Sequence, residues 1–393
     1  MNMNESPMDD IVVRPVPTAP APGAVRLSPV IMTHPRRLVM AKTLGAELGV
    51  PDIVLDPEPH AAPNPLRTAR VAWSAVADGA THHVVLQDDI SASPEVLGQI
   101  SAAVAQFPGA AIACYANWDT RNGELMRLAA LAGVDWVRAR HEEYVPVLAL
   151  SLPEQVARAH PDGTARFDAK YDDSAMSYHL GEQGCPVYIP VPAPVEHIGD
   201  DSISDMNHHG IRRSAVFASD SELLAPGKGR TVLERIDFIP FLRFGESMVV
   251  LDHLVGDGGT PLCVQWSEAM PHIGVGWDAL FEDGAEVSEA GAAPLWREIG
   301  DALGTDYTHA FWVHCFLVGW QVERISRKVP RAARAHGPER RSRVAEIALS
   351  TIGIGGLPRL ERARVSEELR RTLTEAARRR VAAGRRAATR PTG

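Results

Sequence analysis

The sequence predicts an α/β fold, with a mostly parallel sheet between helices followed by a mainly helical C-terminal region. The first observation is that short apolar runs alternate with amphipathic segments over residues 25–117, as in βαβ units. The second is a change beyond about residue 218 to a mixed segment and then long helical stretches. The third is length, because 393 residues exceed one ordinary hydrophobic core and favour more than one domain.

The individual elements follow from the period of their apolar residues and from their stop signals. Glycines 49, 79 and 184 each close a segment with helical spacing. The segment 121–144 reads as an inserted helical or loop segment. The expected strands are residues 25–35, 52–56, 82–89 and 110–117, and the expected helices are residues 36–49, 66–79, 94–107 and 171–184. Residues 145–160 read as a strand followed by a short helix, and residues 186–202 as an extended, Pro-rich strand and loop.

Composition indicates a globular protein, with 45% hydrophobic and 23% charged residues. The four cysteines are scattered and form no CxxC pair, which fits a reducing cytoplasm and argues against structural zinc.

The first residues are acidic and polar and then Pro/Ala-rich, unlike a signal peptide. The longest apolar run, residues 310–322, contains His314 and Gln321 and is shorter than the roughly 20 residues of a membrane span. We expect a buried helix there and a cytoplasmic protein.

Charge is distributed unevenly. Residues 324–393 contain 19 Lys and Arg against 6 Asp and Glu, a net +13, whereas the rest contains 21 against 43, a net −22. A basic tail can bind nucleic acid, anionic lipid or an acidic surface of its own molecule. Its thin apolar stripe favours packing on the body or on a twin subunit, so we expect no nucleic-acid partner and consider a homo-oligomer through the helical region.

Two adjacent carboxylates end a buried strand in the stretch "HHVVLQDDISASP", residues 82–94. Burying Asp88 and Asp89 together is costly unless a cation compensates them. A metal ion, an Arg or Lys side chain, or the N-terminus of the next helix could do so. Side chains alternate along a strand, so only one of the two aspartates is expected to contact a ligand directly. The alternative without a ligand is that the two aspartates lie in a surface turn that precedes a helix.

Four segments together resemble the nucleotide-sugar-dependent glycosyltransferases of the GT-A fold, over about residues 25–203. They are "HPRR" (34–37), "VVLQDDI" (84–90), "YDDSAM" (171–176) and "PVEHIGDDS" (194–202). The resemblance implies that Asp89 binds Mn²⁺ or Mg²⁺, which holds the donor diphosphate, and that Asp88 supports the metal or the ribose. Gln87 stands where many relatives have a carboxylate; it can bond to ribose but brings no charge.

The resemblance also implies a catalytic base and a further metal ligand. Asp173 would be the base that deprotonates the acceptor hydroxyl, and His197 would complete the metal site. Glu196, Asp200 and Asp201 add acidity in the same loop. The alternatives are that the aspartates at 172 and 173 only complement a helix dipole, and that His197 is a loop histidine bonded to backbone.

Residues for binding the nucleotide are expected near the first two helices. His34 and Arg36, with Arg37, lie at a helix N-terminus, where phosphate contacts are natural. Arg67 and Arg70 could bind the diphosphate, and Asp56 could accept from a base or ribose. An Arg on an amphipathic helix is otherwise a solvated side chain, and Trp73 is expected in the core.

These expectations combine into one leading hypothesis. The domains would be a disordered arm (1–24), a GT-A-like catalytic domain (25–215), a mixed and helical domain (216–330) and an Arg-rich helical tail (331–393). The protein would be a metal-dependent glycosyltransferase that moves a sugar from a nucleoside-diphosphate donor to an unidentified acceptor. The alternatives are a non-catalytic binding or assembly protein of the same fold, and a nucleotidyltransferase, which the lack of a Gly-rich, Lys-containing phosphate loop disfavours.

Overall fold

The computed structural model describes residues 10–17, 25–140, 142–167, 171–199, 210–224, 230–255, 260–281, 294–334 and 337–390. The chain forms two compact units. We call the first the sheet unit, made of Val16–Asn117 and Trp136–Arg230, and the second the helical unit, made of Met1–Pro15, Trp118–Asp135 and Thr231–Gly393.

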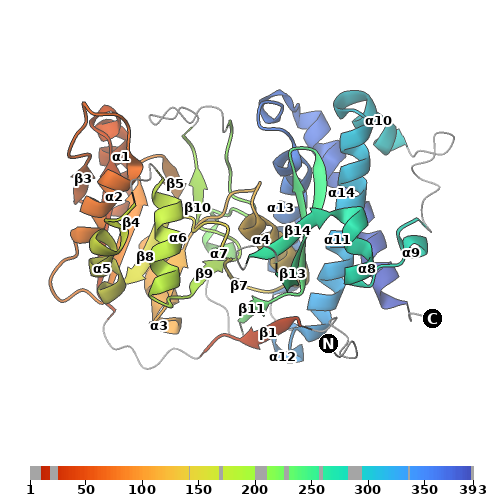
Figure 1. Cartoon of the computed structure of the whole chain (residues 1–393), viewed down its shortest axis with the longest axis horizontal. Coiled ribbons are helices and arrows are strands. Elements are labelled where there is room, and N and C mark those ends of the chain that lie inside the picture. Colours follow the sequence, from red (N-terminus) through yellow and green to blue (C-terminus); the bar gives the residue numbers. More distant parts are fainter. Residues whose placement is uncertain are drawn as a thin grey trace. The chain divides into compact units, whose positions relative to one another are not determined.

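The sheet unit is built on a large mixed sheet, which confirms the predicted α/β class. Its strands lie in the order β7, β9, β6, β8, β4, β2, β3 (Figure 1). The pairs β2–β3, β2–β4 and β6–β9 are parallel, whereas β8 runs antiparallel to β4 and β6, and β7 to β9. The strands are β2 (Leu27–Thr33), β3 (Ile53–Leu55), β4 (His82–Gln87), β6 (Ala111–Ala113), β7 (Trp136–Arg138), β8 (Ala149–Pro153) and β9 (Val187–Pro190).

Helices cover both faces of this sheet, as two neighbouring histidines of β4 show. Successive side chains point to opposite faces. His83 donates to the carbonyl of Ala72 in α2 at 2.8 Å, whereas His82 donates to the carbonyl of Pro108, just after α3, at 3.1 Å. Trp73 is buried on the α2 side, as expected. The helices are α1 (Leu38–Leu48), α2 (Pro65–Ser74), α3 (Val96–Gln106), α5 (Glu154–Thr164), α6 (Asp172–Glu182) and α7 (Ser221–Leu224).

Two predicted helix boundaries are wrong in detail. Helix α2 ends at Ser74, and Gly79, with its positive φ, lies in a later turn. Helix α3 begins at Val96, two residues later than predicted; the hydroxyl of Ser93 accepts from the backbone of Glu95 at 3.3 Å and donates to the Glu95 carboxylate. Gly49 does end α1 in the left-handed conformation that favours glycine.

A short antiparallel sheet next to the large one places the predicted late loop. Strand β10 (Val195–His197) pairs with β5 (Ile90–Ala92), which begins directly after the aspartate pair. His197 is the register partner of Ile90, so the loop that was expected to supply a histidine is held beside Asp89.

The helical unit contains an antiparallel strand pair, a separate three-stranded antiparallel sheet and several long helices. Strand β1 (Val12–Pro15) pairs with β11 (Thr231–Arg235), so this part of the expected disordered arm is a strand; residues 1–9 and 18–24 lie outside the described residues. The other elements are β12 (Phe238–Arg243), β13 (Glu246–Val255), β14 (Pro261–Gln265), α4 (Arg121–Ala132), α8 (Trp266–Ile273), α9 (Trp277–Phe281), α10 (Pro294–Leu303), α11 (Thr305–Lys328), α12 (Arg331–Arg334), α13 (Pro338–Gly356), η5 (Arg362–Arg364) and α14 (Glu367–Thr389).

Helix α11 is the buried helix expected over residues 310–322. The Arg-rich helix α14 packs along it and against α13, so the basic tail lies on its own unit (Figure 1). Arg380 of α14 is buried with its guanidinium 3.4 Å from the ring centroid of Trp312. No helix in the described ranges is long and apolar enough to cross a membrane.

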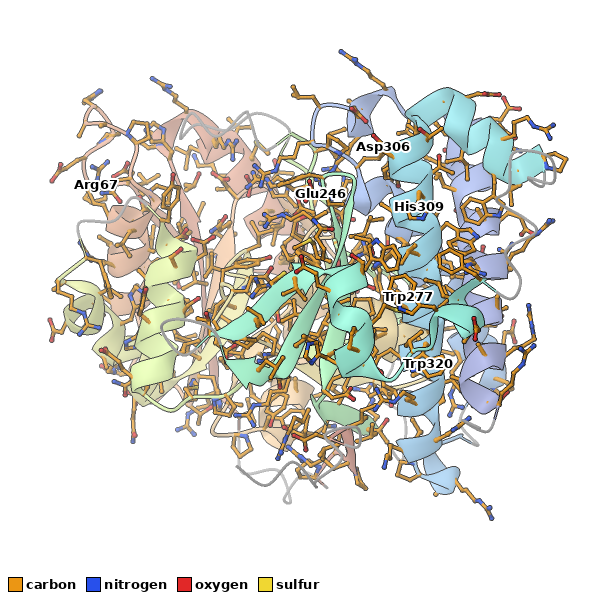
Figure 2. All side chains as sticks on the ribbon, turned by 45° about the vertical axis from the view of Figure 1, so that its right-hand side comes forward. Arg67, Glu246, Trp277, Asp306, His309 and Trp320 are labelled. Carbon is orange, nitrogen blue, oxygen red and sulfur yellow. The ribbon has the colours of Figure 1, made fainter. Side chains whose placement is uncertain are left out.

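Helix α4, in the segment expected to be inserted, is held in the helical unit by buried charges. Arg127 donates to Glu124 at 2.9 Å and to the carbonyl of Thr351 in α13 at 3.0 Å. His314 of α11 lies 3.5 Å from the other oxygen of Glu124. His309, in contrast, is exposed beside Trp266 and not in the core; it is labelled with Trp277 in Figure 2.

Candidate functional site

The site lies in the sheet unit, where β2 and β4 end. The two strands are parallel neighbours, so their carboxyl ends lie at one edge of the sheet. Asp88 and Asp89 directly follow β4, and each is only 7% exposed. The hydroxyl of Thr33, the last residue of β2, donates to Oδ2 of Asp88. The structure therefore confirms that the aspartate pair lies at the carboxyl end of a buried strand.

An arginine compensates the two buried carboxylates. Nη1 of Arg37 donates to Oδ2 of Asp89 at 2.7 Å and to Oδ1 of Asp88 at 3.3 Å. Burial, and then the charge of Asp89, raises the pKa of Asp88. Burial opposes ionisation of Asp89 as well, but His197 and Arg37 outweigh it and hold the pKa of Asp89 well below its usual range. Of the cationic partners considered from sequence, an Arg side chain is the one present.

His197 is directed at Asp89 by its backbone contacts. Its Nδ1 lies 3.3 Å from the carbonyl oxygen of Arg212, which can only accept, so Nδ1 carries the hydrogen. Its Nε2 then faces Oδ2 of Asp89 at 3.4 Å and the guanidinium of Arg212 at 3.1 Å. Nε2 presents a lone pair to a metal only when it carries no hydrogen, as in metal-ligating histidines.

The start of α6 brings two more carboxylates to the same edge. The side-chain amide of Gln87 donates to Oδ2 of Asp172 at 3.1 Å, while Oδ1 of Asp172 accepts from the backbone of Asp173. Oδ1 of Asp173 accepts from the backbone of Ser174 at 2.7 Å. Of these two carboxylates, only Asp173 keeps an oxygen, Oδ2, without a hydrogen-bond partner within the described ranges.

Both carboxyl groups at the start of α6 resist ionisation. Burial, and then the charge of Asp173, raises the pKa of Asp172 to about 7, and the charge of Asp89 adds to this. Burial also raises the pKa of Asp173, opposed in part by hydrogen bonds from Ser174 and by the charge of Arg212. Carboxyl groups with raised pKa values are suited to exchange protons near neutral pH.

The loop around His197 packs closely on Asp89. Oε1 of Glu196 accepts from the backbone of His197 at 2.9 Å and of Ser214 at 2.6 Å, and burial raises the pKa of Glu196 to about 7. A Cβ on Gly199 would lie 2.7 Å from Oδ2 of Asp89, so this position leaves no room for a side chain. Asp200 and Asp201 lie outside the described residues.

The residues expected to bind the nucleotide have individual partners. Asp56 forms a two-bond ion pair with Arg67, with both N–O distances 2.8 Å; of the two, Arg67 is labelled in Figure 2. Arg70 donates to the carbonyls of Thr164 and Phe167, so it fixes the end of α5. These three predicted contact residues are engaged within the protein.

The first loop, residues 34–37, contributes a side chain that contacts the aspartate pair. His34 accepts at Nδ1 from the backbone of Arg36 at 3.2 Å and caps the short turn Pro35–Arg37. Arg36 is exposed, whereas Arg37, its neighbour, contacts the aspartate pair. The sequence predicted Arg36 as a nucleotide contact and mentioned Arg37 only as its neighbour.

Thr33 and Arg212 were not found from the sequence. Thr33 had a usable signal, since it ends the strand that runs parallel to the one carrying Asp88. Arg212 had none, because it follows His197 by fifteen residues and reaches the site only through the folded loop.

The site offers two side chains that fit a divalent cation. Oδ1 of Asp89 is buried and has no hydrogen-bond partner among the described residues, and Nε2 of His197 lies beside the same carboxylate. Within the described ranges, no group of three or more His, Cys, Asp or Glu side chains is placed to hold a metal. Mg²⁺ and similar ions often take only one or two protein ligands and complete their shell with phosphate and water. The pair therefore fits a cation shared with a phosphate ligand.

The sequence matches no protein-family model, and no curated protein is significantly similar to it.

Proposed function

We propose that the sheet unit transfers a sugar from a nucleoside-diphosphate donor to an acceptor hydroxyl, with Mn²⁺ or Mg²⁺ held by Asp89 and His197. The observation that carries the proposal is the convergence of separate segments at one sheet edge. Asp88 and Asp89 directly follow β4, His197 lies on β10, and Asp172 accepts a hydrogen bond from Gln87. Ligands of open α/β sheets bind outside the carboxyl ends of the strands.

Each protein group has a distinct task in this reaction. Asp173 takes the proton of the acceptor hydroxyl through its unengaged Oδ2. The acceptor oxygen then bonds to the anomeric carbon, while the bond from that carbon to the diphosphate breaks and its electron pair leaves with the diphosphate. Asp88, fixed by Thr33, supports the position of Asp89. A bound cation would supply the positive charge that stabilises the leaving diphosphate.

The test is nucleotide binding measured by calorimetry, using UDP and GDP with and without Mn²⁺. The wild type should bind one of them in Mn²⁺, and Asp89→Asn should lose this binding by a factor of about 100 or more. Asp52→Asn, at an exposed position before β3, removes the same charge and should change nothing. Equal binding by wild type and Asp89→Asn would exclude the metal role of Asp89.

A second candidate function is a non-catalytic binding or assembly protein of the same fold. The observation in its favour is that Arg37 already forms ion pairs with Asp88 and Asp89, which offset part of their charge without a ligand. Hydrolysis or transfer from a panel of nucleotide sugars in Mn²⁺ separates the two functions. Turnover that disappears in Asp173→Asn supports the transferase, and binding without any turnover supports the alternative.

A further inference from the structure

The position of Arg37 conflicts with simple occupation of the site by a metal ion. Its Nη1 lies 2.7 Å from Oδ2 of Asp89, the same oxygen that faces Nε2 of His197 at 3.4 Å. A divalent cation bound by Asp89 and His197 would therefore lie beside a guanidinium. Two cations that contact the same carboxylate repel each other strongly when the site is largely shielded from water.

We propose that Arg37 and the divalent cation compete for Asp89, and that the donor diphosphate resolves the competition by accepting Arg37. In the empty site Arg37 pairs with both carboxylates and offsets part of their charge. When cation and diphosphate enter together, the cation takes the carboxylate and the guanidinium moves to the phosphate oxygens. This inference rests on the proposed function, since it assumes a diphosphate ligand.

The location of Arg37 suits both positions. Arg37 lies where the turn Pro35–Arg37 continues into α1. The amides of Arg37 and Leu38 already donate to the carbonyls of His34 and Pro35, so a phosphate here would be bound by the Arg37 guanidinium and not by these amides. A guanidinium binds a carboxylate and a phosphate with the same two-bond geometry. Arg37 can therefore leave the carboxylate for the phosphate without losing this kind of hydrogen bonding.

The carboxylates remain in place when Arg37 leaves. Asp88 keeps its hydrogen bond from Thr33, and the backbone carbonyl of Asp89 accepts from the amide of Ile198 at 2.9 Å. Oδ1 of Asp89 has no hydrogen-bond partner in the described part of the chain, so this buried oxygen gains a ligand when a cation binds. The exchange therefore needs movement of Arg37 from Asp89 and of the Arg212 guanidinium, which lies 3.1 Å from Nε2 of His197.

The consequence is positive coupling between the two ligands. Each ligand removes an obstacle to the other, and by linkage the factor by which diphosphate tightens the cation equals the factor by which the cation tightens diphosphate. Replacing Arg37 by a neutral side chain should remove the competition. The affinity for the cation alone should then rise, while the affinity for the nucleotide should fall.

Calorimetry of Mn²⁺ alone, UDP or GDP alone, and each in the presence of the other tests this directly. We expect Arg37→Gln to bind Mn²⁺ alone about tenfold more tightly than the wild type and to bind the nucleoside diphosphate in Mn²⁺ at least tenfold more weakly. Arg36→Gln removes the same charge from the adjacent exposed position and should leave the affinity for Mn²⁺ alone unchanged. Near-ultraviolet circular dichroism checks that each variant is folded.

The two proposals fail in different ways. Weaker or unchanged Mn²⁺ binding by folded Arg37→Gln overturns the competition, whatever happens to the nucleotide. Arg37→Lys keeps a charge in reach of Asp89, so it should retain weak Mn²⁺ binding, and tight binding there would also count against competition. If no nucleoside diphosphate binds the wild type in any condition, the proposed function fails, while the Mn²⁺ measurements still decide whether Arg37 and the metal compete.

Discussion

The side-chain amide of Gln87 donates a hydrogen bond to Oδ2 of Asp172 at 3.1 Å, and so ties the end of β4 to the start of α6. A carboxylate at position 87 would face Asp172, whose pKa is already raised by burial and by Asp173. The neutral amide therefore allows a link that an acid would turn into repulsion.

The first prediction is that Gln87→Glu destabilises the protein at alkaline pH but little in acid. At pH 8 the new carboxylate lies against Asp172 and should lower the free energy of unfolding by about 1–2 kcal/mol. At pH 5 one of the two groups is protonated and can donate, so most of the loss should vanish. Urea unfolding at both pH values measures this. Gln87→Leu loses the hydrogen bond without adding charge, and an equal loss in both variants at pH 8 would refute the electrostatic explanation.

The second prediction concerns the pH dependence that Asp172 contributes. The pKa of Asp172 in the folded protein is raised to about 7 from the ordinary 3.8, so the folded state holds the proton more tightly. Its favourable contribution is present below about pH 4 and is lost as the pH rises through 7. Asp172→Asn cannot ionise, and should therefore gain about 1 kcal/mol relative to wild type between pH 5 and 8, after allowance for solvent screening.

Urea unfolding of Asp172→Asn across that pH range provides the measurement. Asp52→Asn, at an exposed position, is the matched control and should follow the wild type throughout. A constant difference between Asp172→Asn and wild type would mean that Asp172 does not titrate in this range.

The third prediction is that His160 limits stability in acid. His160 is fully buried in α5 beside Trp73 and His179, and its ring nitrogens have no hydrogen-bond partner among the described residues. Burial, then the charges of His179 and Arg70, lower its pKa to about 3. The contribution is present above pH 6.5 and is lost as the pH falls toward 3, because the unfolded chain takes up the proton first.

His160→Phe keeps an aromatic ring and cannot be protonated, so the midpoint of acid unfolding should move down by about 0.5 pH unit or more. Circular dichroism during acid titration follows the transition. His60→Gln changes an exposed histidine and should leave the midpoint in place. A midpoint that does not move in His160→Phe would show that other groups control acid unfolding.

The sequence predicted those features that depend on local pattern. The period of apolar residues and the stop at Gly49 located β2 and α1, and the strand end of β4 placed Asp88 and Asp89 at the sheet edge. The contacts of Arg37 and Arg212 could not be predicted in the same way, because an exposed and a buried arginine differ only in the tertiary structure around them. For the same reason Arg70, expected to bind phosphate, binds the end of α5.

The fourth prediction concerns the packing of α11 on α14, which depends on two glycines. A Cβ on Gly319 would lie 2.0 Å from the carbonyl oxygen of Val381, and a Cβ on Gly384 would lie 2.0 Å from that of Phe316. Backbone atoms cannot move aside without separating the helices, so Gly319→Ala should cost about 3 kcal/mol in the free energy of unfolding. Gly300→Ala in α10, whose Cβ would meet only an ordinary contact at 3.8 Å, should instead be neutral or stabilise by up to about 1 kcal/mol. Urea unfolding followed by tryptophan fluorescence compares the two, and a Gly319→Ala protein as stable as Gly300→Ala would show that the helices do not approach so closely.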